Sequence, residues 1–314
     1  MTAATIIPVA PFPSAPSSRP AAARAVPPAE SRRSSAADSA STADGVRHPW
    51  YPVSPCGDEC HADNPYAPAN MLIVATRIML LAASTTFFLL TGSLVALLPR
   101  LLRRAYIRTS ARTMLWSMGV RVIVDDRRPF AANTRGLVVA NHISYLDILA
   151  VAVVNPARFV AKCDVMAMPV VSTLARRLGI ISIDRGSLRA LPATVHRAVT
   201  ELQADNSVAV FPEGTTWCGR AGGEFRPAFF QAAIDAGVPV IPLHMEFTVA
   251  GTVTAAAGFI GDDSPADTLR RVLRTRGLGV HILVHESQLP GSDRRELADR
   301  CAGLVGGSVC HPHR

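Results

Sequence analysis

The chain is short of lysine and of charge. Of its 32 basic residues one is lysine, Lys162, and the other 31 are arginine, a bias typical of GC-rich coding sequence that leaves most arginines without a special role. Charged residues make up 18% of the chain, below the ~25% of an average globular protein. This composition excludes a highly charged coiled coil or a fully disordered chain, and it favours a chain partly embedded in lipid.

Motifs of several large protein classes are also missing. The sequence has no Gly-x-Ser-x-Gly elbow, no Gly-x-Gly-x-x-Gly fingerprint and no Walker loop, which argues against a serine hydrolase, a dinucleotide-binding domain and a P-loop domain. The net charge of +8 suits nucleic acid or an anionic membrane. Because no helix-turn-helix, zinc-finger or RNP pattern is present, we expect the membrane as a partner and no nucleic acid.

Cysteine is scarce, and its six copies are scattered rather than arranged as a dense disulfide framework. Residues 1–30 lack the cationic start and apolar run of a secretory signal, so we expect the catalytic part in the reducing cytoplasm. Cys56 and Cys60-His61, like Cys310 with its neighbouring histidines, are candidate metal ligands, but neither group supplies four ligands. The favoured interpretation of both is an exposed tail without metal.

Half of the 24 prolines fall in residues 1–69, a stretch that is also rich in alanine and serine. This stretch has no hydrophobic period and cannot bury enough apolar surface to offset the entropy lost on ordering. We therefore predict a disordered tail over residues 1–69.

The longest apolar run covers residues 78–98, which are 21 residues without a charge. As a helix this run is just long enough to cross ~30 Å of hydrocarbon. Arginines follow Pro99, and the positive-inside rule places this flank in the cytoplasm. Two alternatives remain: a core helix of a soluble domain, or a segment that enters one leaflet beside the amphipathic stretch 101–118. We predict a membrane-associated helical segment over residues 70–118, with the catalytic domain at the cytoplasmic face of the cell membrane.

From about residue 120, short apolar runs alternate with helical stretches, which argues for an α/β layer structure. We place this domain at residues 119–290 and a C-terminal tail at 291–314. Helices are expected at 147–154, 170–178, 187–204, 226–236 and 265–275. Strands are expected at 121–124, 136–140, 158–161, 180–183, 207–211, 240–243 and 280–284.

The first candidate site lies where the strand over 136–140 runs into Asn141-His142, with Asp147 five residues after the histidine. Five residues of a regular helix turn by about 500°, so the two side chains touch only if His142 precedes the helix and Asp147 reaches back from it. An aspartate that accepts from one ring nitrogen leaves the other nitrogen as a base. The alternative is that Asp147 binds backbone amides of the first turn and His142 is a passive turn residue.

The second candidate site follows the strand over 207–211, where Glu213, Gly214 and Thr215 open a turn. Backbone N–H groups in such a turn can bind an anion or an oxyanion. The alternative is an ordinary glycine turn with capping threonines.

Together the two motifs resemble those of the glycerolipid acyltransferases, whose best-known members are the PlsC-like 1-acylglycerol-3-phosphate acyltransferases. Asn-His-x-x-x-x-Asp is followed about 70 residues later by Phe-Pro-Glu-Gly-Thr, and residues 179–186 and 238–242 look like the family's second and fourth blocks. Phe-Val-Ala-Lys at 159–162 matches the family's lysine. The resemblance covers about residues 120–250 and implies a mixed sheet flanked by helices, preceded by a membrane-anchoring helix or helix pair.

The resemblance implies transfer of a fatty acyl group from acyl-CoA or acyl carrier protein to the free hydroxyl of lysophosphatidic acid, which gives phosphatidic acid. A thioester is already activated, so this chemistry needs a base and oxyanion donors but no covalent nucleophile, cofactor or metal. We assign His142 as the general base and Asp147 as the carboxylate that orients it.

The resemblance also implies a set of substrate-binding residues. Lys162 and Arg185 are suited to hold the phosphate of the acceptor. Glu213 and Gly214 help to bind the glycerol phosphate portion, or Glu213 instead holds Arg185 in place. The other expected members of the set are Asn141, Ser144 and Thr215.

Two departures from the family pattern keep other acceptors open. Thr216 stands where the family often has arginine, and Ala228 stands where glycine is common. The same acyl transfer to another lysolipid, such as a lyso-aminolipid, is therefore an alternative. A catalytically inactive lipid-binding protein is a third hypothesis, which the presence of both His142 and Asp147 disfavours.

Overall fold

The computed structural model describes residues 52–62, 68–95, 98–129, 134–162, 179–184 and 186–306. The predicted helix at 170–178 and the candidate residue Arg185 lie outside these ranges. The helices are α1 (Glu59–Ala62), α2 (Met71–Val95), α3 (Arg100–Ser117), α4 (Leu146–Val154), α6 (Leu191–Gln203), α7 (Phe230–Ala236), α8 (Pro265–Arg274) and α9 (Arg294–Val305), and 3-10 turns over Leu188–Ala190 and Pro227–Phe229 precede α6 and α7. The strands are β1 (Arg121–Asp126), β2 (Leu137–Ala140), β3 (Arg158–Lys162), β4 (Ile181–Ile183), β5 (Val208–Val210), β6 (Val240–Val249), β7 (Thr252–Val253) and β8 (Leu278–Val284).

The described strands form one mixed sheet in the order β1-β8-β6-β2-β5-β3-β4, with the short β7 paired to β6. The neighbours β6, β2, β5, β3 and β4 all run parallel, whereas β8 runs antiparallel to β6. The predicted fold class, a mixed sheet flanked by helices, is confirmed. Because β2, β5, β3 and β4 are parallel, their carboxyl ends lie at the same edge of the sheet, where α/β proteins gather reactive groups.

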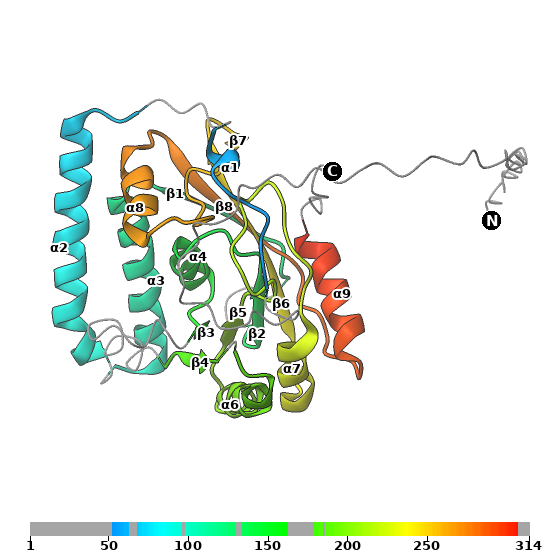
Figure 1. Cartoon of the computed structure of the whole chain (residues 1–314). Helices are drawn as coiled ribbons and strands as arrows, with labels where there is room; N and C mark the ends of the chain where they lie inside the picture. The colour runs from blue at the N-terminus through cyan, green and yellow to red at the C-terminus, as the bar shows by residue number, and fades with distance from the viewer. Residues whose placement is uncertain are drawn as a thin grey trace, which may run out of the picture. The chain divides into compact units, whose positions relative to one another are not determined.

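The sheet is covered on both faces (Figure 1). Alternate residues of β2 belong to two different cores, as expected for a strand buried on both sides. Val138 and Ala140 pack in one core with α3, α4 and α8. Leu137 and Val139 pack in the other with α6, α7 and α9. The turn after β2 is therefore anchored by a fully buried strand.

Helices α2 and α3 run side by side along the domain (Figure 1). By length and composition α2 is the described helix that is able to cross a membrane: Met71–Gly92 has a mean hydropathy of 1.9 and is 6% buried. Near its end, Thr91 Oγ1 lies 2.5 Å from Tyr106 Oη of α3. Near its start, the Arg77 guanidinium donates to the carbonyls of Leu273 and Thr275 at 2.7 and 2.9 Å. The start of α2 is thus attached to the end of α8, and its end is attached to α3, which itself packs in the core.

Two segments that the sequence assigns to tails have a place in this fold. Residues 294–305 form α9, in which Leu297 and Cys301 are fully buried against the core of α6 and α7. The side chain of Asp293 accepts from Arg295 N at 2.7 Å and caps its first turn. Residues 52–62 lie against the loops that follow β5 and β7. A Cβ atom added to Gly261 would lie 3.4 Å from Gly57 Cα. The structure therefore differs from the predicted tails at these residues.

Candidate active site

His142 lies in the turn that leads from β2 into α4, and Asp147 is in the first turn of that helix. The Nδ1 atom of His142 is 2.9 Å from Oδ2 of Asp147. The Asp147 side chain is fully buried, whereas 16% of the His142 side chain is exposed. The predicted contact is present in the expected way, with the histidine before the helix and the aspartate reaching back to it.

The same Asp147 oxygen also binds the backbone of the turn. Oδ2 accepts from the N–H groups of Ile143 at 2.6 Å and Ser144 at 2.8 Å. Asp147 therefore makes both of the contacts that the sequence offered as alternatives, since one oxygen holds the first turn and the histidine ring. A carboxylate oxygen can only accept, so the hydrogen-bond network assigns a proton to Nδ1, and in the neutral ring Nε2 is then unprotonated. That nitrogen is available as a base.

Glu213 joins the His142 turn to the loop that follows β5. Its Oε2 accepts from His142 N at 2.6 Å, and its Oε1 accepts from Gly223 N at 2.9 Å. Burial raises the pKa of Glu213 to about 8; the N–H groups of Gly223 and His142 act against this rise, and the nearby Asp147 carboxylate adds to it. Glu213 thus holds the His142 turn and the loop that follows β5 together through hydrogen bonds to one backbone N–H group of each.

The imidazole ring of His142 is held by an aromatic neighbour as well as by Asp147. It stacks on Phe211, with ring centroids 4.0 Å apart and planes 7° from parallel. Phe159 lies behind Phe211 at 6.3 Å. The flat contact on one face and the hydrogen bond at one edge together fix the orientation of the ring.

Asn141 and Ser144 both have partners within the protein. Asn141 exchanges two hydrogen bonds with the backbone of Met245 on β6, at 2.9 and 2.8 Å. Ser144 is fully buried, and its hydroxyl accepts from Leu146 N at 3.3 Å. Asn141 therefore fixes the end of β2 to β6, and Ser144 supports the start of α4.

Gly214 and Thr215 lie in the loop that follows β5. Gly214 has a φ of +77°, a left-handed conformation that favours glycine, and a Cβ atom there would make a tight contact with Pro52 at 3.0 Å. Thr215 is half-buried in the same loop. The hydroxyl of Thr216, the residue that departs from the family pattern, donates to the carbonyl of Phe259.

Lys162 is the last residue of β3, two strands away from His142 in the order β2-β5-β3. The register pairs Val208 of β5 with both Leu137 and Arg158, which puts residue 162 at nearly the same level as residue 142. Strands lie about 4.8 Å apart, so the two backbone positions are roughly 10 Å apart along one edge of the sheet. Arg185 lies outside the described residues.

A pocket of about 380 Å³ lies beside His142. Its walls come from the turn after β2, from the loop over residues 213–225, from His244 on β6 and from the end of α9. His244 Nδ1 is 2.7 Å from the carbonyl oxygen of Val305, a contact that fixes α9 to β6. This wall lies outside the site predicted from the sequence, although Leu297, Cys301 and Val305 follow the spacing of a helix face. Of the predicted residues, Asn141, His142 and Glu213 line the pocket.

The chain is similar to several known proteins. Residues 121–246 match the model of the Acyltransferase family. The chain is 36% identical over 168 residues to a lyso-ornithine lipid O-acyltransferase from Pseudomonas aeruginosa, which covers 53% of this chain and 65% of that protein. It is 38% identical over 122 residues to a 1-acyl-sn-glycerol-3-phosphate acyltransferase from Neisseria gonorrhoeae, which covers 38% of this chain and 48% of that protein. The chain thus spans between about half and two thirds of these two curated relatives.

A solved structure has the same fold. The crystal structure of the 1-acyl-sn-glycerophosphate acyltransferase PlsC from Thermotoga maritima superimposes with a TM-score of 0.56 at 22% identity, over 75% of this chain and 92% of that one. The matched residues 121–246 contain the His142 turn, Asp147, Lys162 and the loop of Glu213. These residues are therefore similar in sequence to the Acyltransferase family, and the chain shares the fold of PlsC.

Proposed function

We propose that the chain transfers a fatty acyl group from a thioester to the free hydroxyl of a lysolipid, with His142 as general base. The observation that carries this proposal is the single Asp147 oxygen that holds both His142 Nδ1 and the backbone of the turn. It presents an unprotonated Nε2 in a ring that lines a pocket. Comparable arrangements of a histidine and a buried carboxylate activate hydroxyl groups in other enzymes.

In this reaction Nε2 of His142 removes the proton from the acceptor hydroxyl as its oxygen attacks the thioester carbonyl carbon. A new C–O bond forms and a tetrahedral oxyanion develops. The oxyanion collapses, the C–S bond breaks, and the thiolate takes the proton from the imidazolium. The products are the acylated lipid and the free thiol of coenzyme A or acyl carrier protein. Asp147 stabilises the imidazolium between these two proton transfers.

The acceptor that we propose first is lysophosphatidic acid. Lys162 lies at the sheet edge roughly 10 Å from His142, a separation that suits a lipid whose hydroxyl and phosphate are joined by a glycerol backbone. Arg185, which follows β4 in the sequence, is proposed as the second phosphate ligand.

A lyso-ornithine lipid is the second candidate acceptor, and a specific observation favours it. The alignment of 168 residues with a lyso-ornithine lipid O-acyltransferase is longer than that of 122 residues with a 1-acyl-sn-glycerol-3-phosphate acyltransferase, at similar identity. In addition, Thr216 replaces an arginine that is frequent in the family, and its hydroxyl is bonded to Phe259. One cationic group for a phosphate is thus absent at this position.

We further propose that α2 enters one leaflet of the membrane beside the domain rather than crossing the bilayer. A helix of 25 residues is about 37 Å long, and Arg77 and Thr91 attach its two ends to the domain. A crossing helix would pull one of these ends away from the domain. Of the arginines that follow Pro99, Arg100 and Arg108 already have partners in the domain at 3.2 and 3.0 Å. The others are proposed to meet anionic headgroups at the cytoplasmic face.

The acceptor is tested with the full chain purified in detergent. Radiolabelled acyl-CoA, and in parallel acyl carrier protein, is offered with lysophosphatidic acid, lyso-ornithine lipid and lysophosphatidylethanolamine, each beside the His142→Ala variant. Product with lysophosphatidic acid supports the first candidate, and product with lyso-ornithine lipid alone supports the second. No product with any acceptor and either donor would overturn the proposed activity.

The membrane arrangement is tested by a peptide tag at the N-terminus of the full chain expressed in bacteria. A helix that enters one leaflet keeps both of its ends in the cytoplasm, so protease added to intact spheroplasts should leave the tag in place. Removal of the tag before lysis would show that α2 crosses the bilayer.

A further inference from the structure

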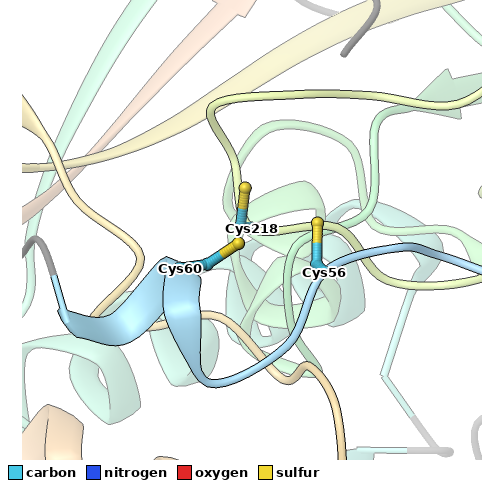
Figure 2. Close-up of side chains that lie close together, drawn as sticks. All are labelled: Cys56, Cys60 and Cys218. Atoms are coloured by element: carbon cyan, nitrogen blue, oxygen red, sulfur yellow. The ribbon is translucent and has the colours of Figure 1, made fainter. Parts of the chain in front are cut away.

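Three cysteine side chains meet beside the pocket, from segments about 160 residues apart in the sequence. Cys56 and Cys60 belong to the segment before α2, and Cys218 follows the loop of Glu213. Their sulfur atoms all lie within 4.8 Å of one another, and Figure 2 shows the three side chains close together. None of the three is joined in a disulfide.

This spacing is close to what a tetrahedral metal requires. Zinc binds thiolate sulfur at about 2.3 Å, so two sulfurs of one tetrahedral site lie roughly 3.8 Å apart. Each pair in the cluster therefore has to close by about 1 Å at most to share one ion. A fourth position remains for a water molecule, as in sites with three protein ligands.

The surroundings also suit a metal site. Cys218 is buried among apolar side chains, Ala221, Ala255 and Ile260, whereas Cys56 and Cys60 are half-buried. The buried side supplies a dry, shaped wall, and the half-buried side supplies a path by which an ion and a water molecule can enter. Thiolate is the ligand type that zinc and other thiophilic ions prefer.

We propose that Cys56, Cys60 and Cys218 bind one zinc-class metal ion, which fastens residues 52–62 to the loop that forms one wall of the pocket. Binding releases the thiol protons and forms three metal–sulfur bonds. The loop concerned supplies Trp217 and Gly223 to the pocket lining. Trp217 N donates to the His142 carbonyl at 2.8 Å, and Gly223 N donates to Glu213. The ion is structural: it holds the wall and takes no part in the acyl transfer.

The contacts around the cluster explain why an ion at this place would affect the pocket. Pro52 lies 3.0 Å from the Cβ position of Gly214, and His61 Nε2 lies 3.3 Å from Asp263 Oδ2. Segment 52–62 thus touches the loop that follows β5 and the loop that follows β7. Metal–thiolate bonds would add a stronger link between Cys218 and this segment.

The test measures metal in the full chain, purified in detergent under reducing conditions, loaded with zinc and freed of excess ion. Mass spectrometry of the metal content should give about one zinc per chain for the wild type. The measurement should give no zinc for Cys218→Ser or for Cys60→Ser. Because the Cys60 side chain is only half-buried, Cys60→Ser should keep the fold intact. The matched control is Cys301→Ser, a buried cysteine of α9 outside the cluster, which should keep its zinc.

Cobalt provides a second measurement that is independent of activity. Cobalt bound by three thiolates gives a sulfur-to-metal charge-transfer band, and each single cysteine substitution should weaken or abolish it. A chelator should lower the unfolding temperature of the wild type and leave that of Cys60→Ser unchanged.

The proposal is overturned if the wild type binds no more zinc than Cys60→Ser, which would mean that the thiols only pack as small apolar side chains. It is also overturned if the chain retains a disulfide between two of these cysteines under the reducing conditions of the assay, found as a cross-linked peptide by mass spectrometry.

Discussion

Replacement of Asp147 by asparagine separates two tasks of this side chain, orientation and charge. In the wild type, Oδ2 accepts from His142 Nδ1 and from the N–H groups of Ile143 and Ser144. An amide flipped to place its NH₂ group there would face two backbone donors. The asparagine of Asp147→Asn is therefore expected to keep its oxygen in the position of Oδ2, so that it still accepts from Nδ1 and preserves the tautomer.

Asp147→Asn should therefore lose activity mainly because the side chain no longer carries a negative charge. A hydrogen bond to a charged group contributes about 1.5–3 kcal/mol and a neutral one about 0.5–1.5 kcal/mol, so the imidazolium loses roughly 1.5 kcal/mol of stabilisation. Since about 1.36 kcal/mol corresponds to tenfold in rate, kcat should fall about tenfold. Asp147→Ala also removes the orientation of the ring, and kcat should then fall by about 10³–10⁴, as when a catalytic triad is broken.

The amide also has a cost for stability. Oδ1 of Asp147 is buried and has no hydrogen-bond partner among the described residues, so the NH₂ group that replaces it has no acceptor there. The free energy of unfolding of Asp147→Asn should fall by about 1–3 kcal/mol. Initial rates at saturating donor and acceptor, with circular dichroism as the folding control, measure kcat for both variants. Equal losses of kcat in Asp147→Asn and Asp147→Ala would refute the argument that the backbone amides hold the orientation of this side chain.

Three further changes test the framework around the site. The pKa of Glu213 is about 8 in the folded protein and 4.5 in the unfolded chain, so the stability that its proton contributes is lost as the pH rises from about 5 to 8. The free energy of unfolding of Glu213→Gln, measured by thermal unfolding, should therefore rise relative to that of the wild type across this window, by up to about 5 kcal/mol. The same pH dependence in both proteins would contradict the raised pKa. Asn141→Asp leaves the Met245 carbonyl without its donor. It should therefore lower the free energy of unfolding by about 1–3 kcal/mol and reduce kcat, and unchanged urea unfolding would count against the role of Asn141 as a link. Ser264 forms a capping box at the start of α8, and Ser264→Ala should cost about 1 kcal/mol with no change in activity, which urea unfolding and the rate assay check together.

The sequence predicts best what is local along the chain. His142 and Asp147 are five residues apart in one strand–turn–helix unit, so their contact follows from backbone geometry once the helix start is placed. The strands after residue 120 were found because each is a short apolar run, and all seven expected strands are present to within a few residues, β6 being longer than expected. The family resemblance added the order and spacing of the motifs.

What the sequence did not predict depends on distant packing. Helix α9 forms a wall of the pocket because His244 contacts the carbonyl oxygen of Val305. This contact depends on the position of β6 within the sheet. The meeting of Cys56 and Cys60 with Cys218 depends on where residues 52–62 lie, which no periodicity encodes. Glu213 was expected to bind substrate or arginine, whereas its two oxygens accept from the backbone of His142 and Gly223. Such contacts are fixed by the whole fold and not by a local pattern.

The central claim, that His142 is the base of a direct acyl transfer, is tested most directly by His142→Gln. Glutamine keeps a polar side chain that is able to hydrogen bond to Asp147 but cannot accept a proton from a hydroxyl group. The measurement is the rate of transfer of a labelled acyl group from acyl-CoA to the preferred lysolipid, with thermal unfolding as the folding control. The account predicts a folded variant whose kcat is lower by at least about 10² and a wild type that forms no covalent acyl-enzyme. A variant with wild-type kcat would contradict it.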